Sequence, residues 1–399
     1  MTSRDRMLAS IRCESVDYVP CSFMIFFNLR QRCRSEAEFI EKQIELGLDP
    51  YSHVGYLKPS LHPAATEKTW TEKEAGQTVC CRRIDTPKGP LTQRVAQMEG
   101  WPQGADFWMF NDWVVPRTRE ILVKPETDLE KLPYLLGPFR DADIQALRES
   151  ARVAQELARR HHLLVVGGWA SSNSVGLGDD GVMGADAMAW LSGYVEVMTL
   201  SLTQPDLIKE YMRIIHEWNV RQIQVYLDVT ESDLILRRAW YETTEFWTPG
   251  AYREIVAPLL RREVEIVHQA GKLFGLIVTS AFLPILDDIL ATGIDVLIGL
   301  DPEEGKGTDM VEVKKRFWTK RRAIWGGVSG AITVEQATER ETEQAVLRAL
   351  RTLAPGGGFI LSPVDNVRDN TPKAWRNTAR FIEAWKKERA APVHLGPYG

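Results

Sequence analysis

The sequence is poor in cysteine and lacks the spacing that cysteine-based sites require. Its 399 residues include five cysteines, an odd number without a C-x-x-C pair. They are Cys13, Cys21, Cys33, Cys80 and Cys81. A disulfide framework is typical of small secreted chains, and a zinc knuckle needs paired thiols at short spacing. The sequence therefore predicts reduced thiols and neither kind of site.

Long apolar runs and an excess of positive charge are also absent. No stretch of about 18 uncharged apolar residues occurs, so no membrane-spanning helix is predicted. Residues 1–6 are polar and lack the apolar core of a signal peptide, and we expect a cytoplasmic protein. The formal net charge is −5, and no basic cluster is interleaved with aromatics, so we expect no DNA or RNA partner.

Tryptophan, by contrast, is abundant, with 13 residues. Those in predicted loops include Trp70, Trp101, Trp108, Trp113, Trp169, Trp240 and Trp247. Core packing explains part of this number, and aromatics at strand ends also suit a flat or apolar ligand. The sequence leaves both interpretations open.

Residues 272–370 repeat one structural unit four times. Short apolar runs, each followed by an amphipathic helical pattern, are what a parallel sheet buried under helices requires. The predicted strands are 273–278, 295–300, 322–327 and 358–362, and the helices begin near residues 283, 310, 333 and 374. The pattern predicts an α/β fold.

Polar residues follow each of these strands, where a parallel sheet presents its ligand. They are Thr279, Asp301, Ser329, Asp365 and Asn366. Any one of them is more often a turn former or helix cap. Their occurrence at the same end of four strands favours a site.

Four further strands are predicted earlier in the chain, at 17–26, 51–56, 163–167 and 233–238. The total of eight is the number that a closed (β/α)8 TIM barrel needs. Trp169 and Asn173 follow the third strand, and Trp240, Tyr241 and Glu242 follow the fourth. His53 lies within the second strand, where a lone histidine is more often packed than functional.

The connection between the second and third strands is far longer than a normal crossover. It contains an alternating pattern over residues 69–81 and 82–94 that predicts a β-hairpin, and a further extended piece at 118–123. We therefore expect an insertion over residues 57–140 that covers the barrel mouth, where lids exclude water.

Short motifs spread over nearly the whole chain resemble the uroporphyrinogen decarboxylase superfamily. They are Asp17-Tyr-Val-Pro20, Thr248-Pro-Gly-Ala-Tyr252, Pro284-Ile-Leu-Asp-Asp288, Gly293-Ile-Asp-Val-Leu-Ile298, Trp325-Gly-Gly327, and Pro355-Gly-Gly-Gly-Phe-Ile-Leu-Ser-Pro363 with Thr371-Pro372. The superfamily also holds cobamide-dependent methyltransferases, and cobalamin-independent methionine synthase is a distant relative. The resemblance implies a single (β/α)8 barrel over residues 1–399, closer to the methyltransferase branch than to true uroporphyrinogen decarboxylases.

Two departures from the family pattern bear on the substrate and on metal binding. The decarboxylases place two arginines after Val-Pro to engage substrate carboxylates, where this chain has Ile25 and Leu29. Because unpaired buried carboxylates are costly, decarboxylation of uroporphyrinogen itself is disfavoured. The methyltransferases bind zinc through His-x-Cys and a later Cys, where this chain has Ile277, Thr279 and Asp365. We expect no zinc at these positions.

A different metal site would have to use oxygen and imidazole ligands. The residues that could supply it are His53, Glu242, Asp301 and Asp365. We do not favour such a site and expect no metal.

Three functions remain open. The first, which we favour, is transfer of a methyl group from a small methoxylated or methylated compound to a corrinoid, with a positioned acid protonating the leaving group. The second is a cofactor-free decarboxylase or lyase acting on a carboxylated aromatic or tetrapyrrole, with Arg237 or Arg238 holding the carboxylate. Neighbouring strand residues face opposite ways, so only one of these arginines can point into the barrel. The third is a ligand-binding barrel without catalysis.

The candidate catalytic acids are Glu242 and Asp365, because burial at a strand end can raise a carboxyl pKa. Both could instead cap local turns. The candidate substrate-binding residues are Asn28, His53, Trp169, Asn173, Trp240, Tyr241, Thr279, Asp301, Ser329 and Asn366. The resemblance further implies a small-molecule substrate, a corrinoid supplied by a separate carrier protein, and a homodimer as the candidate assembly.

Overall fold

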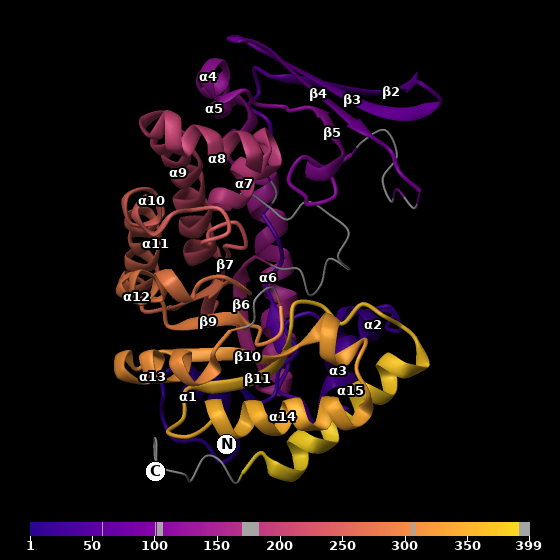
Figure 1. Cartoon of the computed structure of the whole chain (residues 1–399), viewed down its shortest axis with the longest axis vertical. Coiled ribbons are helices and arrows are strands. Elements are labelled where there is room, and N and C mark those ends of the chain that lie inside the picture. Colours follow the sequence, from indigo (N-terminus) through magenta and orange to yellow (C-terminus); the bar gives the residue numbers. More distant parts are fainter. Residues whose placement is uncertain (58, 100, 102–106, 170–182, 305–307, 391–399) are drawn as a thin grey trace.

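A computed structural model describes residues 1–57, 59–99, 101, 107–169, 183–304 and 308–390. Seven parallel strands form one sheet in the order β1-β6-β7-β8-β9-β10-β11. Their bounds are β1 (Tyr51–His53), β6 (Leu164–Gly168), β7 (Leu234–Arg238), β8 (Leu273–Ile277), β9 (Val296–Leu300), β10 (Ala323–Ser329) and β11 (Phe359–Val364). Helices separate these strands along the chain, and the predicted α/β barrel is confirmed (Figure 1).

An irregular segment near the N-terminus occupies the eighth position of the barrel. Cys21 bridges Leu361 and Ile25 bridges Asn366, both in parallel. The Asp49 amide donates to the Cys21 carbonyl at 2.8 Å, which connects the segment to the entry of β1. The strand predicted at 17–26 is thus present only as two isolated β-bridges. The strand predicted at 51–56 is shorter than expected, since β1 ends at His53 and Gly55, with φ of +104°, turns the chain.

Side chains that alternate in direction along each strand divide the core into a layer inside the barrel and a layer between the barrel and the helices. Leu234 and Leu236 of β7 belong to a cluster inside the barrel that also contains Trp325, whereas Ile235 packs among the surrounding helices. The Trp325 indole donates to the Ser22 carbonyl at 2.8 Å, which ties the irregular segment to the interior.

Six of the fifteen helices in the described ranges begin at a side-chain cap, namely α1, α3, α10, α13, α14 and α15. Thr338 and Glu341 form a reciprocal capping box at α14, and Ser35 accepts the Glu38 amide at 3.1 Å at the start of α3. The helices are α1 (Ser3–Ile11), α2 (Phe27–Arg30), α3 (Glu36–Glu45), α4 (Pro125–Asp128), α5 (Leu132–Leu135), α6 (Asp141–His161), α7 (Gly184–Ser192), α8 (Tyr194–Thr203), α9 (Pro205–Val229), α10 (Pro249–Ala251), α11 (Ala257–Gln269), α12 (Leu286–Ala291), α13 (Met310–Lys320), α14 (Glu339–Leu353) and α15 (Pro372–Glu388). None of the helices within the described ranges is long and apolar enough to cross a membrane.

The insertion between β1 and β6 contains a four-stranded antiparallel sheet, visible at the top of Figure 1. Its strands are β2 (Thr66–Glu74), β3 (Gln77–Thr86), β4 (Gly89–Ala96) and β5 (Thr118–Glu120). The predicted turn near residues 81 and 82 was wrong, because the chain reverses at Ala75-Gly76 and again after Thr86. Ala75 and Gly76 both have positive φ, the conformation that a two-residue hairpin turn favours.

Gly168, at the end of β6, allows the close approach of β7 on which the site depends. Its φ is +90°, and a Cβ atom there would lie 2.2 Å from the Leu236 carbonyl oxygen. The next residue, Trp169, donates its amide to that same oxygen at 3.0 Å.

We expect Gly168→Ala to lower the free energy of unfolding by about 2–5 kcal/mol, through backbone strain and steric overlap. The matched control is Gly271→Ala, where φ is +69° but no atom lies within 4 Å of the added Cβ. The control should lose about 1–2 kcal/mol. Denaturant unfolding checks both variants, and equal losses would contradict the close-approach argument.

Candidate functional site

The end of β7 places two arginines on opposite sides of the barrel wall. Arg238 lies on the same interior face of the strand as Leu234 and Leu236. Arg237 lies on the opposite face, with Ile235, and points toward the helices outside the barrel. Both side chains are buried, with 4% exposure for Arg237 and 0% for Arg238. Of the two candidate cations, Arg238 is therefore the one that points into the mouth.

Arg237 lies in an ion-pair cluster outside the barrel wall. Its guanidinium donates to both carboxylate oxygens of Glu242, at 2.6 and 2.7 Å, and its Nε lies 2.7 Å from Glu263 of α11. His216 of α9 is 2.9 Å from the other oxygen of Glu263. Burial alone would raise the pKa of Glu263, but Arg237 and the His216 hydrogen bond hold it below its ordinary value.

Glu242 is held so tightly that its geometry fits a structural role better than proton transfer. Besides Arg237, it accepts the Ala185 amide at 3.0 Å. A Cβ atom on Gly184 would lie 1.9 Å from its Oε1 atom, so the carboxylate lies directly against the start of α7. Its role as a catalytic acid, inferred from its place after a strand, stays a prediction that this arrangement disfavours.

Arg238 meets two carboxylates at the mouth. Its Nη2 lies 2.6 Å from Asp112 of the insertion, and its Nε lies 3.1 Å from Asp186 of α7. The guanidinium also stacks on Trp190 and Trp240, 4.6 and 3.9 Å from the ring centroids. Burial raises the pKa of Asp186 to about 7, although the positive charge of Arg238 acts to lower it. For Asp112 the attraction outweighs burial, and its pKa is lowered.

Aromatic residues predicted to bind substrate surround this ion pair. Tyr241 donates its hydroxyl to Asp112 at 2.8 Å and its amide to Asp186 at 2.7 Å. Trp169 and Trp240 meet edge to face with centroids 5.7 Å apart. The buried indole nitrogen of Trp240 has no hydrogen-bond partner within the described part of the chain.

Asp365, the second candidate acid, differs from Glu242 in having an unused oxygen. It follows β11 with φ of +59°, and its side chain is 33% exposed. Its buried Oδ1 atom has no hydrogen-bond partner among the residues that the structure describes, while Oδ2 lies 3.9 Å from Arg368. Burial raises the pKa of Asp365, against the opposing charges of Arg368 and Arg238.

Residues from the neighbouring barrel positions lie beside Asp365. Asn366 accepts the Phe27 amide at 3.4 Å. Asn28 is fully buried and donates to the Asp369 carbonyl at 3.1 Å, and its own carbonyl oxygen has no hydrogen-bond partner in the described ranges. These contacts bring the predicted Asn28, Asp365 and Asn366 together at the junction that closes the barrel.

The other predicted residues take part in local backbone structure. Asp301 accepts the amides of Glu303 and Glu304 at 2.8 and 3.0 Å, and burial raises its pKa. Ser329 caps the turn that follows β10 by accepting the Ile332 amide at 3.2 Å. Thr279 is half-buried after β8, and its carbonyl accepts the Asp301 amide at 3.3 Å. Asn173 lies outside the described residues.

Sequence reasoning missed three partners of Arg238, namely Asp112, Asp186 and Trp190. Asp112 lies 126 positions before Arg238, and no local pattern marks so distant a pairing. Asp186 lies in the first turn of α7, where an acidic residue is ordinary for a helix start. The one available signal was the pair Arg237-Arg238 itself, because two adjacent charges in a buried strand require counter-charges on both faces.

The residues present do not fit a thiolate zinc site. Ile277, Thr279 and Asp365 occupy the ligand positions expected from the methyltransferase branch. Within the described ranges, no group of three His, Cys, Asp or Glu side chains is placed to hold a metal. Cys21, whose backbone forms a β-bridge with Leu361 of β11, is buried. Its burial raises the pKa of the thiol, which disfavours the thiolate that a zinc ion needs.

Comparison with known proteins agrees with this architecture. The sequence model of the uroporphyrinogen decarboxylase (URO-D) family matches residues 185–387, just over half of the 399-residue chain. The fold resembles a methyltransferase from Methanosarcina mazei at 16% identity, covering 97% of this chain and 99% of that one, with a TM-score of 0.58. A 3-keto-D-glucoside 4-epimerase from E. coli matches at 14% identity over 66% of this chain and 95% of that one, with a TM-score of 0.35. No curated protein sequence matches significantly.

The Arg237 cluster makes a prediction about stability. Glu242→Gln should lower the free energy of unfolding by about 3 kcal/mol, because it removes one charge of a buried ion pair. The matched control is Glu245→Gln in the same loop, where the side chain is exposed and a change within about 0.5 kcal/mol is expected. Denaturant unfolding measures both, and an unshifted midpoint for Glu242→Gln would contradict a structural role.

Proposed function

The chain belongs to the uroporphyrinogen decarboxylase family, and from this premise we propose that it is a methyltransferase acting on a small methylated or methoxylated compound. The methyl acceptor in this proposal is a corrinoid presented by a separate carrier protein. The family match supports an enzyme of the decarboxylase or methyltransferase kind, and the shared barrel with the M. mazei protein is compatible with the second.

The observation that carries the proposal is the unused carboxyl oxygen of Asp365. Removal of a methyl group from an ether or amine leaves a poor leaving group, which a positioned acid must protonate. The raised pKa of Asp365 keeps the proton on the carboxyl to a higher pH than in water. Its buried Oδ1 atom has no hydrogen-bond partner in the described chain, so a substrate heteroatom that reaches it would break no existing bond there.

A corrinoid, when bound, supplies the strong nucleophile that accepts the methyl group. Trp240 is the residue of this chain that we assign to its flat ring, because its indole is partly exposed at the end of β7. Trp169 supports Trp240 from the side, and Arg238 stacks on it at 3.9 Å. These contacts hold the indole in one orientation.

One observation favours a second candidate, the cofactor-free decarboxylase. Arg238 is a buried cation that faces the barrel mouth, as a carboxylate-binding residue would. In the present structure it pairs with Asp112 and Asp186, so a substrate carboxylate would have to replace at least one of them. Release of carbon dioxide from a panel of aromatic acids, lost in Arg238→Met, would establish this function in place of methyl transfer.

The first test is an anaerobic absorbance assay with purified protein, reduced cobalamin and a panel of methoxylated aromatics and methylated amines. Growth of the methylcobalamin spectrum with one donor is the expected result. Asp365→Asn should lower the rate about 100- to 10,000-fold, because the general acid is lost. The control is Asp206→Asn on α9, whose side chain is 97% exposed and which should keep full activity. A fully active Asp365→Asn variant would exclude this acid.

The direction of the Asp365 pKa also predicts a pH dependence. Because the protonated carboxyl is the active form, turnover should be level at low pH and fall as the pH rises through the raised pKa of Asp365. In Asp365→Asn the residual activity should lose this alkaline decline, since no carboxyl remains to titrate. Turnover measured across a pH series with both proteins checks the assignment. An identical decline in the variant would assign it to another group.

A further inference from the structure

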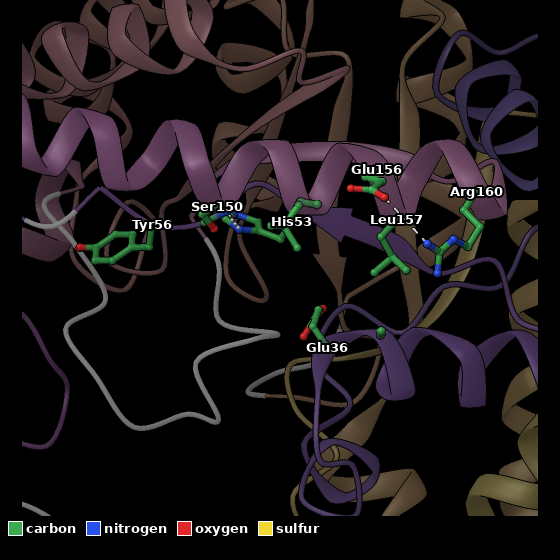
Figure 2. Close-up of a pocket in the computed structure, with 11 residues that line it drawn as sticks. Glu36, His53, Tyr56, Ser150, Glu156, Leu157 and Arg160 are labelled. Carbon is green, nitrogen blue, oxygen red and sulfur yellow. Dashed lines mark hydrogen bonds and ion pairs between the residues drawn. The ribbon is translucent and has the colours of Figure 1, made fainter.

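The surfaces outside the barrel mouth differ in how far they define a partner. The pocket between α3 and α6, of about 670 Å³, is lined by apolar groups and by charged residues of both signs, which select no single class of ligand (Figure 2). The insertion sheet (β2–β5) has a more specific surface, because the backbone and the side-chain order of its outer edge together define a complementary strand. Figure 1 shows this sheet at the top of the molecule, apart from the barrel strands.

β2 is an edge strand of the insertion sheet. The strand order is β2-β3-β4-β5, so in the part of the chain that the structure describes β2 pairs with β3 alone. Most of its nine residues are exposed. An edge strand of this length is a template for pairing with a further strand, unless its charges or its shape oppose the contact.

The turn after β2 fixes which backbone groups face the open edge. Glu74 and Gln77 flank the two-residue turn, so they form a hydrogen-bonded pair. Because the direction of the backbone groups alternates along a strand, the even-numbered residues of β2 direct their amide and carbonyl groups toward β3. The amide and carbonyl groups of the odd-numbered residues point to the open edge.

The side-chain order of β2 is complementary to itself when a second copy runs antiparallel. With the two Trp70 residues opposite each other, Lys68 lies opposite Glu72 of the second copy, and Glu67 lies opposite Lys73. Each of these ion pairs occurs twice, because the arrangement has two-fold symmetry. Opposite charges at directly opposed positions stabilise a pair of strands, and every charge from residue 67 to residue 73 is matched in this way.

The uncharged residues at the centre fit the same register. Thr69 lies opposite Thr71 of the second copy, and the two Trp70 side chains meet at the symmetry axis. Since Trp70 directs its backbone groups toward β3, the two tryptophans form a non-hydrogen-bonded pair, the kind in which side chains are closest. A shift by two residues keeps neither ion pair, and a shift by one opposes backbone groups that face different ways. The complementarity therefore defines one register.

Lys68 and Glu72 are the charges best placed to select this register. Lys68 is exposed and has no ion-pair partner among the described residues, and its ammonium lies 5.9 Å from the centre of the Trp70 ring. Glu72 accepts a hydrogen bond from the Trp70 indole at 2.8 Å, and Arg94 lies 3.4 Å from it. This hydrogen bond and the charge of Arg94 hold the pKa of Glu72 below its ordinary value, so the carboxylate is negative at neutral pH.

Glu67 and Lys73 contribute less to the selection, since each already has a partner in its own chain. Arg82 lies 2.5 Å from Glu67, and Lys73 donates to the Thr78 hydroxyl at 2.7 Å. Variants of Lys68 and Glu72 therefore report most directly on the contact between copies.

We propose that the chain forms a homodimer in which β2 pairs antiparallel with β2 of a second copy. The contact joins two four-stranded insertion sheets into one sheet of eight strands. Backbone hydrogen bonds give the affinity, and the order of charges fixes the register. The proposal does not depend on methyl transfer, and it places the contact in the insertion instead of on the barrel.

Sedimentation velocity of the full chain from about 1 to 100 μM should show a species of twice the 45.3 kDa chain mass, at concentrations typical of a small interface. Thr71→Pro removes an amide that faces the open edge, whereas the bonds to β3 come from the even-numbered residues and remain. This variant should therefore stay monomeric with its fold intact, as checked by circular dichroism. A monomeric original chain at the highest concentration, or a dimeric Thr71→Pro, would overturn the proposal.

A charge exchange tests the register independently of Thr71→Pro. Lys68→Glu and Glu72→Lys should each weaken the dimer about 10- to 100-fold, because two attractive cross-strand pairs become repulsive. An equimolar mixture of the two variants should dimerise about as well as the original chain, since the two kinds of chain carry opposite charges at both positions. A folding defect would not be corrected by mixing.

The matched control is Lys315→Glu on α13, an exposed position where the same change of charge should leave the dimer unchanged. Dimerisation that is insensitive to Lys68→Glu and Glu72→Lys would assign the contact to another surface. Failure of the mixture to recover would exclude the antiparallel register.

Discussion

Neutralisation of two adjacent buried guanidinium groups is the constraint on which this structure depends. A β-strand turns neighbouring side chains to opposite faces, so Arg237 and Arg238 cannot share counter-charges. Arg237 is paired with Glu242 and with Glu263 of α11, and Arg238 with Asp112 of the insertion and Asp186 of α7. Because an unpaired buried charge is strongly destabilising, the outer helices, the insertion and the barrel mouth are coupled through one dipeptide.

This coupling also decides which carboxyl groups remain available for chemistry. A carboxylate whose oxygens both accept hydrogen bonds from the protein has no oxygen left to offer a substrate. Glu242 accepts two bonds from Arg237, and Asp112 accepts bonds from Arg238, Trp190 and Tyr241. Asp365 is at the opposite extreme, since burial favours its neutral form and one oxygen has no partner in the described residues. In the proposed reaction, we therefore assign proton donation to Asp365 rather than to Glu242 or Asp112.

The sequence predicted features that depend on neighbours along the chain and missed those that depend on distant ones. The repeated strand and helix patterns, and the local turn or cap roles of Asp301 and Ser329, all arise from contacts within a few residues. The hairpin turn was misplaced because strand alternation continues through residue 81, and the signal at Ala75-Gly76 is short. The pairing of Asp112 with Arg238 could not be inferred, since nothing in the insertion marks which strand end it meets. Glu242 was chosen for its place after a strand, a criterion that does not reveal on which side of the barrel wall it lies.

Charge balance at the mouth bears on the kind of substrate that the barrel accepts. A polyanionic tetrapyrrole needs several unopposed cations, and the two positions where the decarboxylases place arginine hold Ile25 and Leu29. Arg238 does not replace them, because two carboxylates already lie within 3.1 Å of its guanidinium nitrogens. A neutral ether, by contrast, needs only an aromatic surface and one proton donor, and Trp240 and Asp365 are the candidates for these two roles in the proposed reaction. The balance of buried charge therefore disfavours a polyanionic substrate, and within the proposed function it favours a methyl donor without carboxylates.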